Sequence, residues 1–100
     1  MNDRILTLLL LIAISVKLSA DDIKGRLLDS KKSSIGGVAV IMQTIDSVFV
    51  DAVISNDEGY FIFNQPFNSY ILHFQHIQFD SFSILIKGKN VGDIFLKEKD

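Results

Sequence analysis

The 100-residue sequence contains no cysteine, no tryptophan and only one proline. Without cysteine there can be no disulfide scaffold, no thiolate zinc site and no lipoprotein cleavage site. The chain also has no large excess of one charge: it contains ten basic and twelve acidic residues, and its formal net charge is −2. That balance excludes a nucleic-acid binder that works by electrostatic attraction. The length allows one small domain and excludes a multidomain enzyme.

The apolar residues are unevenly distributed along the chain. A mostly aliphatic run at residues 5–16 follows Arg4 and is followed by Ser19-Ala20, whereas every aromatic residue lies at or beyond Phe49. A positive start, a short apolar run and a small-residue end are typical of a secretory signal peptide. As a helix the run would extend about 18 Å, short of the ~30 Å hydrocarbon core. We therefore predict a signal helix at residues 1–20 and a mature domain at 21–100. An uncleaved membrane anchor and an amphipathic helix of the domain are the alternatives.

Beyond residue 21 the apolar residues recur with a period close to two, which is typical of strands. Clusters of Gly, Asn, Asp and Ser divide this region into seven short segments: Ile23–Asp29, Val38–Met42, Ser47–Ile54, Tyr60–Phe63, Tyr70–Gln75, Phe79–Ile86 and Val91–Leu96. Seven strands without a convincing helix predict an all-β fold, a seven-stranded antiparallel Ig-like sandwich. We expect six aromatic residues to supply much of its core: Phe61, Phe63, Tyr70, Phe74, Phe82 and Phe95.

Several short motifs occur in a recognisable order between Asp22 and about Lys97. They are Ile23-x-Gly25-x-Leu27-x-Asp29, Ile35-Gly36-Gly37-Val38-Ala39-Val40, Ser55-Asn56-Asp57-Glu58-Gly59-Tyr60-Phe61 and Tyr70-x-Leu72-x-Phe74. Together they resemble the carboxypeptidase regulatory-like domain, a transthyretin-like sandwich. This domain occurs at the N-terminus of many TonB-dependent outer-membrane receptors of the Bacteroidota, including SusC-type transporters.

The most specific part of the resemblance is a structural turn motif, residues 55–61, similar to the family's Thr-Asp-x-x-Gly-x-Phe turn. Two strands must reverse direction there within a few residues. We expect the Asn56 and Asp57 side chains to accept hydrogen bonds from nearby backbone N–H groups. Gly59 should take a positive φ, and Phe61 should return to the core.

No constellation for metal binding is evident in the sequence. His73 and His76 are three residues apart, so on a regular strand they point to opposite faces and cannot easily share one ion. The run Asn56-Asp57-Glu58-Gly59 lacks the spacing of a calcium loop and is better explained as a turn. We therefore predict no metal site and no cofactor.

Catalytic chemistry is not evident either. None of the serines lies in a nucleophile-elbow motif, and neither His73 nor His76 lies near a serine in a recognisable motif. A small ureide hydrolase shares the transthyretin-like sandwich, but it needs a His/Arg/His set and a Tyr-Arg-Gly-Ser tail. Arg26 is the only arginine after residue 20, and that tail is absent. We therefore expect no catalytic residue and no enzyme activity.

The resemblance implies a non-enzymatic accessory module of the cell envelope, exported to the periplasm or outer membrane of a Gram-negative, Bacteroidota-like cell. A receptor would continue beyond Asp100 with a plug and a barrel, and no segment here suits an outer-membrane strand, so we expect no transport by these residues. The implied partners are proteins, either a receptor plug and barrel or a periplasmic protein. The resemblance implies no nucleic-acid partner. It implies contact with a membrane only through the parent receptor or through an uncleaved signal. The alternative is a free-standing secreted module for carbohydrate binding or adhesion, which would need exposed aromatics on one face.

Overall fold

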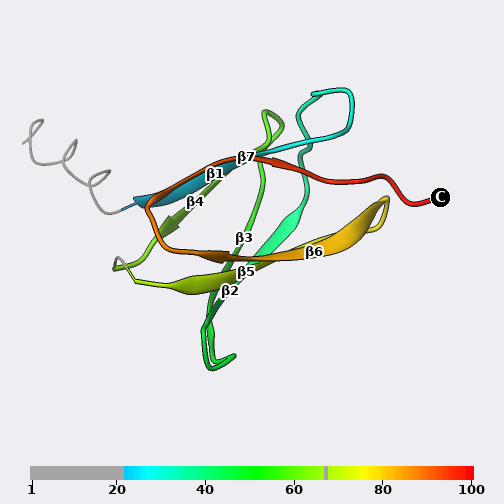
Figure 1. Cartoon of the computed structure of the whole chain (residues 1–100). Helices are drawn as coiled ribbons and strands as arrows, with labels where there is room; N and C mark the ends of the chain where they lie inside the picture. Colours follow the sequence, from blue (N-terminus) through cyan, green and yellow to red (C-terminus); the bar gives the residue numbers. More distant parts are fainter. Residues whose placement is uncertain (1–21, 67) are drawn as a thin grey trace, which may run out of the picture.

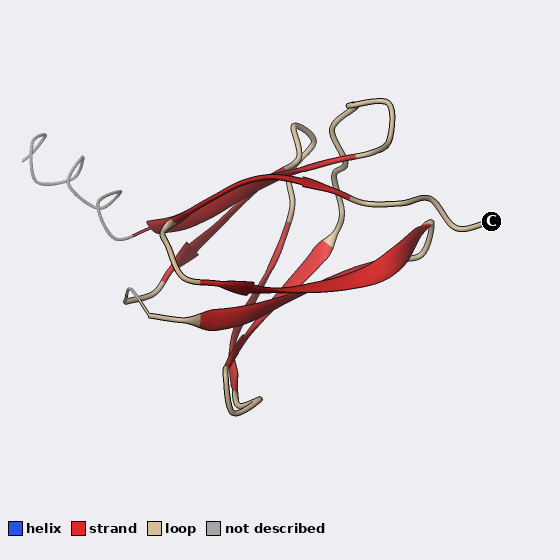
Figure 2. Ribbon diagram, in the orientation of Figure 1, coloured by secondary structure: helices blue, strands red, loops and turns tan. Residues whose placement is uncertain are grey.

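The computed structural model describes residues 22–66 and 68–100, which form seven strands and no helix (Figures 1 and 2). The strands are β1 (Asp22–Leu28), β2 (Ala39–Thr44), β3 (Phe49–Ile54), β4 (Tyr60–Asn64), β5 (Tyr70–His76), β6 (Phe79–Ile86) and β7 (Asn90–Phe95). All seven predicted strands are therefore present. The predicted signal helix at residues 1–20 lies outside the described residues. Within the described part of the chain, nothing forms a helix that could cross a bilayer.

The strands form two sheets that face each other as two layers in Figure 1. One sheet has the order β4-β1-β7 and the other β3-β2-β5-β6. All neighbours in the four-stranded sheet are antiparallel, but β1 pairs in parallel with β7. The prediction of a wholly antiparallel sandwich was thus wrong for this pair. The cause is the connection at residues 87–89, which leads from β6 in one sheet to β7 in the other, and a crossover permits the parallel direction that a tight hairpin forbids.

The space between the sheets is filled by one cluster of buried side chains, and aromatic rings hold its centre. Phe61 packs edge-on against Phe63 and Phe74, with ring centroids 6.2 Å and 5.7 Å apart. The remaining members are mainly aliphatic: Ile23, Leu27, Ile35, Val38, Val40, Met42, Tyr70, Leu72, Phe79, Ile86 and Leu96. Four of the six predicted core aromatics, Phe61, Phe63, Tyr70 and Phe74, are buried as expected.

The other two predicted core aromatics, Phe82 and Phe95, are 43% and 53% exposed. Phe95 faces outward because of a bulge in β7: Lys24 pairs with Asn90 but Gly25 pairs with Gly92, so Val91 is an extra residue. An alternation counted from Val91 would place Phe95 inward, and one extra residue reverses that placement. Phe82 stacks on Phe74 at 6.2 Å, but it belongs to the edge strand β6, which leaves one side of its ring open.

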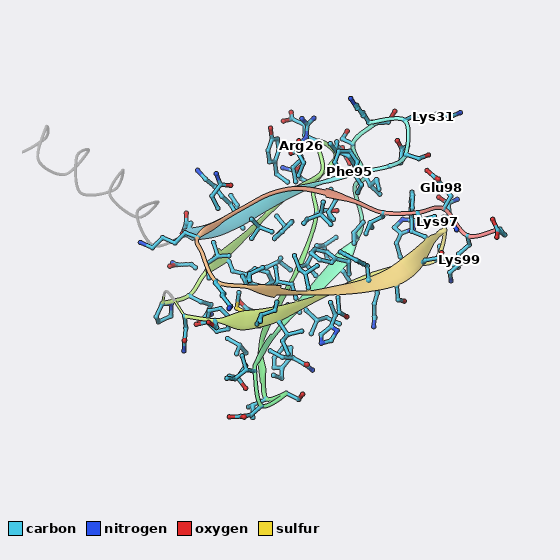
Figure 3. The ribbon with its side chains drawn as sticks, viewed as in Figure 1. Arg26, Lys31, Phe95, Lys97, Glu98 and Lys99 are labelled. Atoms are coloured by element: carbon cyan, nitrogen blue, oxygen red, sulfur yellow. The ribbon has the colours of Figure 1, made fainter. Side chains whose placement is uncertain are left out.

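The segment after β7 joins the two sheets at one end of the sandwich. Leu96 donates a backbone hydrogen bond to Leu28 in the first sheet. Asp80, at the start of β6 in the second sheet, donates to Lys97, and Lys99 donates to Gln78. Figure 3 shows Lys97, Glu98 and Lys99 beside this end of β6. The segment therefore covers the first residues of β6 and leaves the rest of that strand open.

Candidate interaction surface

Residues 55–61 form the turn between β3 and β4. The Asn56 side-chain oxygen accepts hydrogen bonds from the backbone N–H groups of Glu58 (3.0 Å) and Tyr60 (2.9 Å). Gly59 has a φ of 84°, as predicted. The Asp57 side chain was also predicted to accept backbone hydrogen bonds. Instead, the backbone carbonyl oxygen of Asp57 accepts a hydrogen bond from Ser34 Oγ at 3.1 Å. One side-chain acceptor therefore suffices to close the turn.

Ser55 has a role in the core that the sequence did not reveal. Its side chain is 4% exposed, and its hydroxyl accepts from the backbone N–H of Val38 (2.9 Å) and donates to the carbonyl of Ile35 (2.8 Å). The serine thereby satisfies two main-chain groups of the segment that leads into β2. No sequence signal could have identified this contact, because the partners are 17 and 20 residues away. Ser55 therefore links the turn motif to the segment that leads into β2.

The free edges of the two sheets are candidate contact surfaces, and two of the four carry features that oppose strand addition. The edge strand β3 carries Asp51 and has an irregular register with β2. The edge strand β7 carries Asp93 and the bulge at Gly92. Charges and bulges on an edge hinder pairing with another strand. The β3 and β7 edges are therefore protected.

The edge strand β6 lacks this protection over most of its length. It has eight residues, and from Ser81 to Ile86 none is charged. Its irregular register with β5 is confined to the first residues, near Phe79, which the C-terminal segment covers. The fourth edge, β4, is also uncharged but has only five residues. Within the described chain, β6 is thus the longest uncharged edge open to a partner strand.

Glu98 anchors the C-terminal segment that borders this edge. Its carboxylate accepts hydrogen bonds from the Ser30 hydroxyl, at 3.1 Å and 3.3 Å, and from the Ser30 backbone N–H. Hydrogen bonds from its own backbone and from Ser30 lower the pKa of Glu98, since they favour the charged form. The carboxylate is therefore ionised at neutral pH and ties the loop after β1 to the segment beside β6.

The two histidines lie on opposite faces of β5, as their spacing predicted. His73 pairs with Ile41 and Ser83, on the outer face of the sheet, whereas His76 pairs with the core residue Phe79. Among the described residues, no group of three or more His, Cys, Asp or Glu side chains could hold a metal ion.

His73 lies beside a serine in the folded chain, although no recognisable sequence motif contains the two residues. Its Nδ1 is 2.5 Å from the hydroxyl oxygen of Ser83, and its Nε2 is 2.8 Å from Oε1 of Gln43. Three neighbouring strands, β2, β5 and β6, bring these residues together. Their separations of 10 and 30 residues along the chain hide the cluster from any short motif.

A shallow hollow of about 190 Å³ lies on the other sheet, lined by Lys24, Gly25, Arg26, Tyr60, Asn90, Gly92 and Asp93. The Arg26 guanidinium lies 5.0 Å from the centre of the Tyr60 ring, and its Nε donates to the carbonyl of Glu58 at 3.0 Å. Figure 3 shows Arg26 and Phe95 along the same sheet. One face of Tyr60 is therefore occupied by Arg26 and is not free to stack against a ligand.

Comparison with known proteins supports the fold alone. No family model and no curated protein matches the chain. Among solved structures, the Bacillus anthracis TIE protein is similar, with a TM-score of 0.59 and 17% sequence identity. The match covers 78% of this chain and 16% of that protein's chain, so the chain spans only a small part of its structural relative. The chain is thus a β-sandwich that shares its architecture with one part of the TIE protein.

Proposed function

We propose that the chain is a non-enzymatic accessory module of the cell envelope that contacts a partner protein through the free edge of β6. The observation that carries this proposal is the uncharged, unprotected edge from Ser81 to Ile86. The outward backbone N–H and C=O groups of an edge strand can pair with a strand from another chain. Such strand addition needs no catalytic residue, metal or cofactor.

The exposure of side chains along β6 indicates what kind of strand would fit. Phe82 and Ile84 lie on the core side of the sheet, and Phe82 is 43% exposed because no strand lies beyond it. Leu85, on the outer side, is 54% exposed. An added strand with apolar residues at alternate positions would cover Phe82 and extend the core by one strand. The partner segment is therefore extended and apolar on one face.

The envelope location in this proposal rests on the sequence. The predicted signal at residues 1–20 supports export, and the resemblance to the carboxypeptidase regulatory-like domain supports a position beside a TonB-dependent receptor. We expect the exported protein to begin near Asp21. Mass spectrometry of the intact protein from an envelope fraction checks this expectation, and a product that retains Met1 would contradict it.

The alternative, a secreted module for carbohydrate binding or adhesion, would use the outer face of the β4-β1-β7 sheet. Tyr60, which lines the hollow, and Phe95 are both exposed on this sheet. Sugar-binding platforms need an open aromatic face, and Arg26 covers one face of Tyr60. We therefore favour protein contact over carbohydrate binding.

Self-association of the purified chain tests the proposed edge, because a second copy can supply the added strand. We expect weak association with a dissociation constant on the order of 0.1–1 mM, since a single strand pairing buries little surface. The variant Ser81→Lys places a charge on the β6 edge and should weaken the association severalfold. The matched control is Phe49→Lys, which removes an exposed aromatic from the opposite edge strand β3.

Sedimentation equilibrium over a range of concentrations measures both variants against the parent. The proposal predicts that Ser81→Lys is more monomeric than the parent and that Phe49→Lys is not. If Phe49→Lys were more monomeric than the parent and Ser81→Lys were not, the contact would lie on β3. A parent chain that stays monomeric at millimolar concentration would also contradict the proposal.

A further inference from the structure

Three polar side chains form a hydrogen-bonded row on the outer face of the four-stranded sheet. Gln43 extends from β2, His73 from the neighbouring strand β5, and Ser83 from the edge strand β6. His73 connects the other two, with Nε2 2.8 Å from the Gln43 side-chain oxygen and Nδ1 2.5 Å from the Ser83 hydroxyl. Strand addition uses the backbone groups of β6 and not these three side chains, so what the side chains can do is a separate question.

The chemistry of the three groups determines where the protons lie. With the side-chain oxygen of Gln43 placed 2.8 Å from His73 Nε2, the neutral tautomer that satisfies this contact carries its proton on Nε2 and donates to that oxygen. In a neutral imidazole the other nitrogen, Nδ1, is then an acceptor. The Ser83 hydroxyl therefore donates to Nδ1. An activated serine has the same arrangement: the serine is the nucleophile, a base accepts its hydrogen bond, and a third group orients the base. Here these groups are Ser83, His73 and Gln43.

Ser83 is also accessible to a reagent. The residue is exposed, and its strand β6 lies at the edge of the sheet. Apolar side chains of Ile41, Ile71 and Leu85 flank the row and can contact a small acyl group.

We propose that Ser83 is an acyl-acceptor site that reacts selectively with activated esters of small carboxylic acids. Ser83 Oγ attacks the ester carbonyl carbon while His73 Nδ1 takes the hydroxyl proton. The bond from the carbonyl carbon to the leaving oxygen then breaks, and the proton passes from His73 to that oxygen. The products are an ester on Ser83 and the free alcohol. In this step His73 is the base, and Gln43 is a positioning residue that acts through His73.

The test is acetylation by p-nitrophenyl acetate, with the modified residue located by tandem mass spectrometry. Ser81 is an internal control, because it is an exposed serine two residues earlier on the same strand and has no histidine partner among the described residues. We expect Ser83 to be acetylated at least about tenfold faster than Ser81, since general-base assistance typically exceeds that factor. The comparison is made within one folded protein and needs no variant.

Variants then assign the roles. His73→Gln should reduce acetylation of Ser83 to the rate of Ser81. Gln43→Leu should slow it severalfold, whereas Gln43→Glu keeps a side-chain acceptor for Nε2 and should preserve the rate. Equal acetylation of Ser81 and Ser83 in the parent would overturn the proposal. An unchanged rate at Ser83 in His73→Gln would overturn it as well.

Discussion

Replacing Phe61 with alanine is expected to lower the free energy of unfolding by about 3–5 kcal/mol. Phe61 is 2% exposed, and its ring packs against Phe63 and Phe74 at the centre of the core. The substitution removes those contacts and leaves a cavity that the surrounding strands can fill only in part. Stability on the order of 5 kcal/mol is usual for a domain of this size, so the variant should retain at most about 2 kcal/mol and unfold at a much lower urea concentration than the parent.

The neighbouring residue Gly25 offers a sharper test of the same packing. A Cβ atom added at Gly25 would lie 2.6 Å from the Phe61 ring, which is closer than carbon atoms can approach. Gly25→Ala should therefore destabilise the parent by about 1–3 kcal/mol. In the Phe61→Ala background the ring is gone, so the added methyl group should cost much less or stabilise the domain.

Urea unfolding of the parent, both single variants and the double variant gives the coupling between the two positions. The packing seen here predicts that the double variant is more stable than the sum of the two single effects implies. Additive effects would mean that the Phe61 ring does not lie over Gly25.

Gly59→Ala is expected to destabilise the domain by about 3 kcal/mol or more, through two effects. The φ of 84° at Gly59 is unfavourable for any residue with a side chain, and an added Cβ would lie 2.4 Å from the carbonyl oxygen of Leu27. That oxygen already accepts a hydrogen bond from Ile35, so it cannot move without loss. Chemical denaturation followed by circular dichroism measures the change.

Gly88→Ala is the matched control, because it is the same substitution in another turn. Nothing lies within 4 Å of a Cβ atom built at Gly88, and its φ is not positive. We expect its stability to stay within about 0.5 kcal/mol of the parent. Similar stability for the Gly59 and Gly88 variants would contradict the turn described at residues 55–61.

Features that depend on a few consecutive residues could be predicted from the sequence. The alternation of apolar residues predicted all seven strands, and Asn56 and Gly59 predicted the turn, because their preferences act within five residues. Phe61 and Phe63 were assigned to the core correctly because β4 has no bulge. In each case the local pattern and the final structure agree.

Features set by pairing between distant segments could not be predicted. The parallel pairing of β7 with β1 depends on the crossover from the other sheet, and the exposure of Phe95 depends on the bulge at Gly92. The row of Gln43, His73 and Ser83 exists only because β2, β5 and β6 become neighbours in one register. The open edge at β6 is likewise a property of strand order, which no local pattern contains.

Residue-resolved amide hydrogen exchange in dilute and concentrated solutions of the chain tests the edge proposal most directly. If β6 receives the strand of a second copy, amides between Ser81 and Ile86 that face outward in the monomer should exchange more slowly as the concentration rises. Amides of β3, from Phe49 to Ile54, should exchange at an unchanged rate. Slower exchange in β3 with no change in β6 would contradict the assignment of β6 as the contact edge.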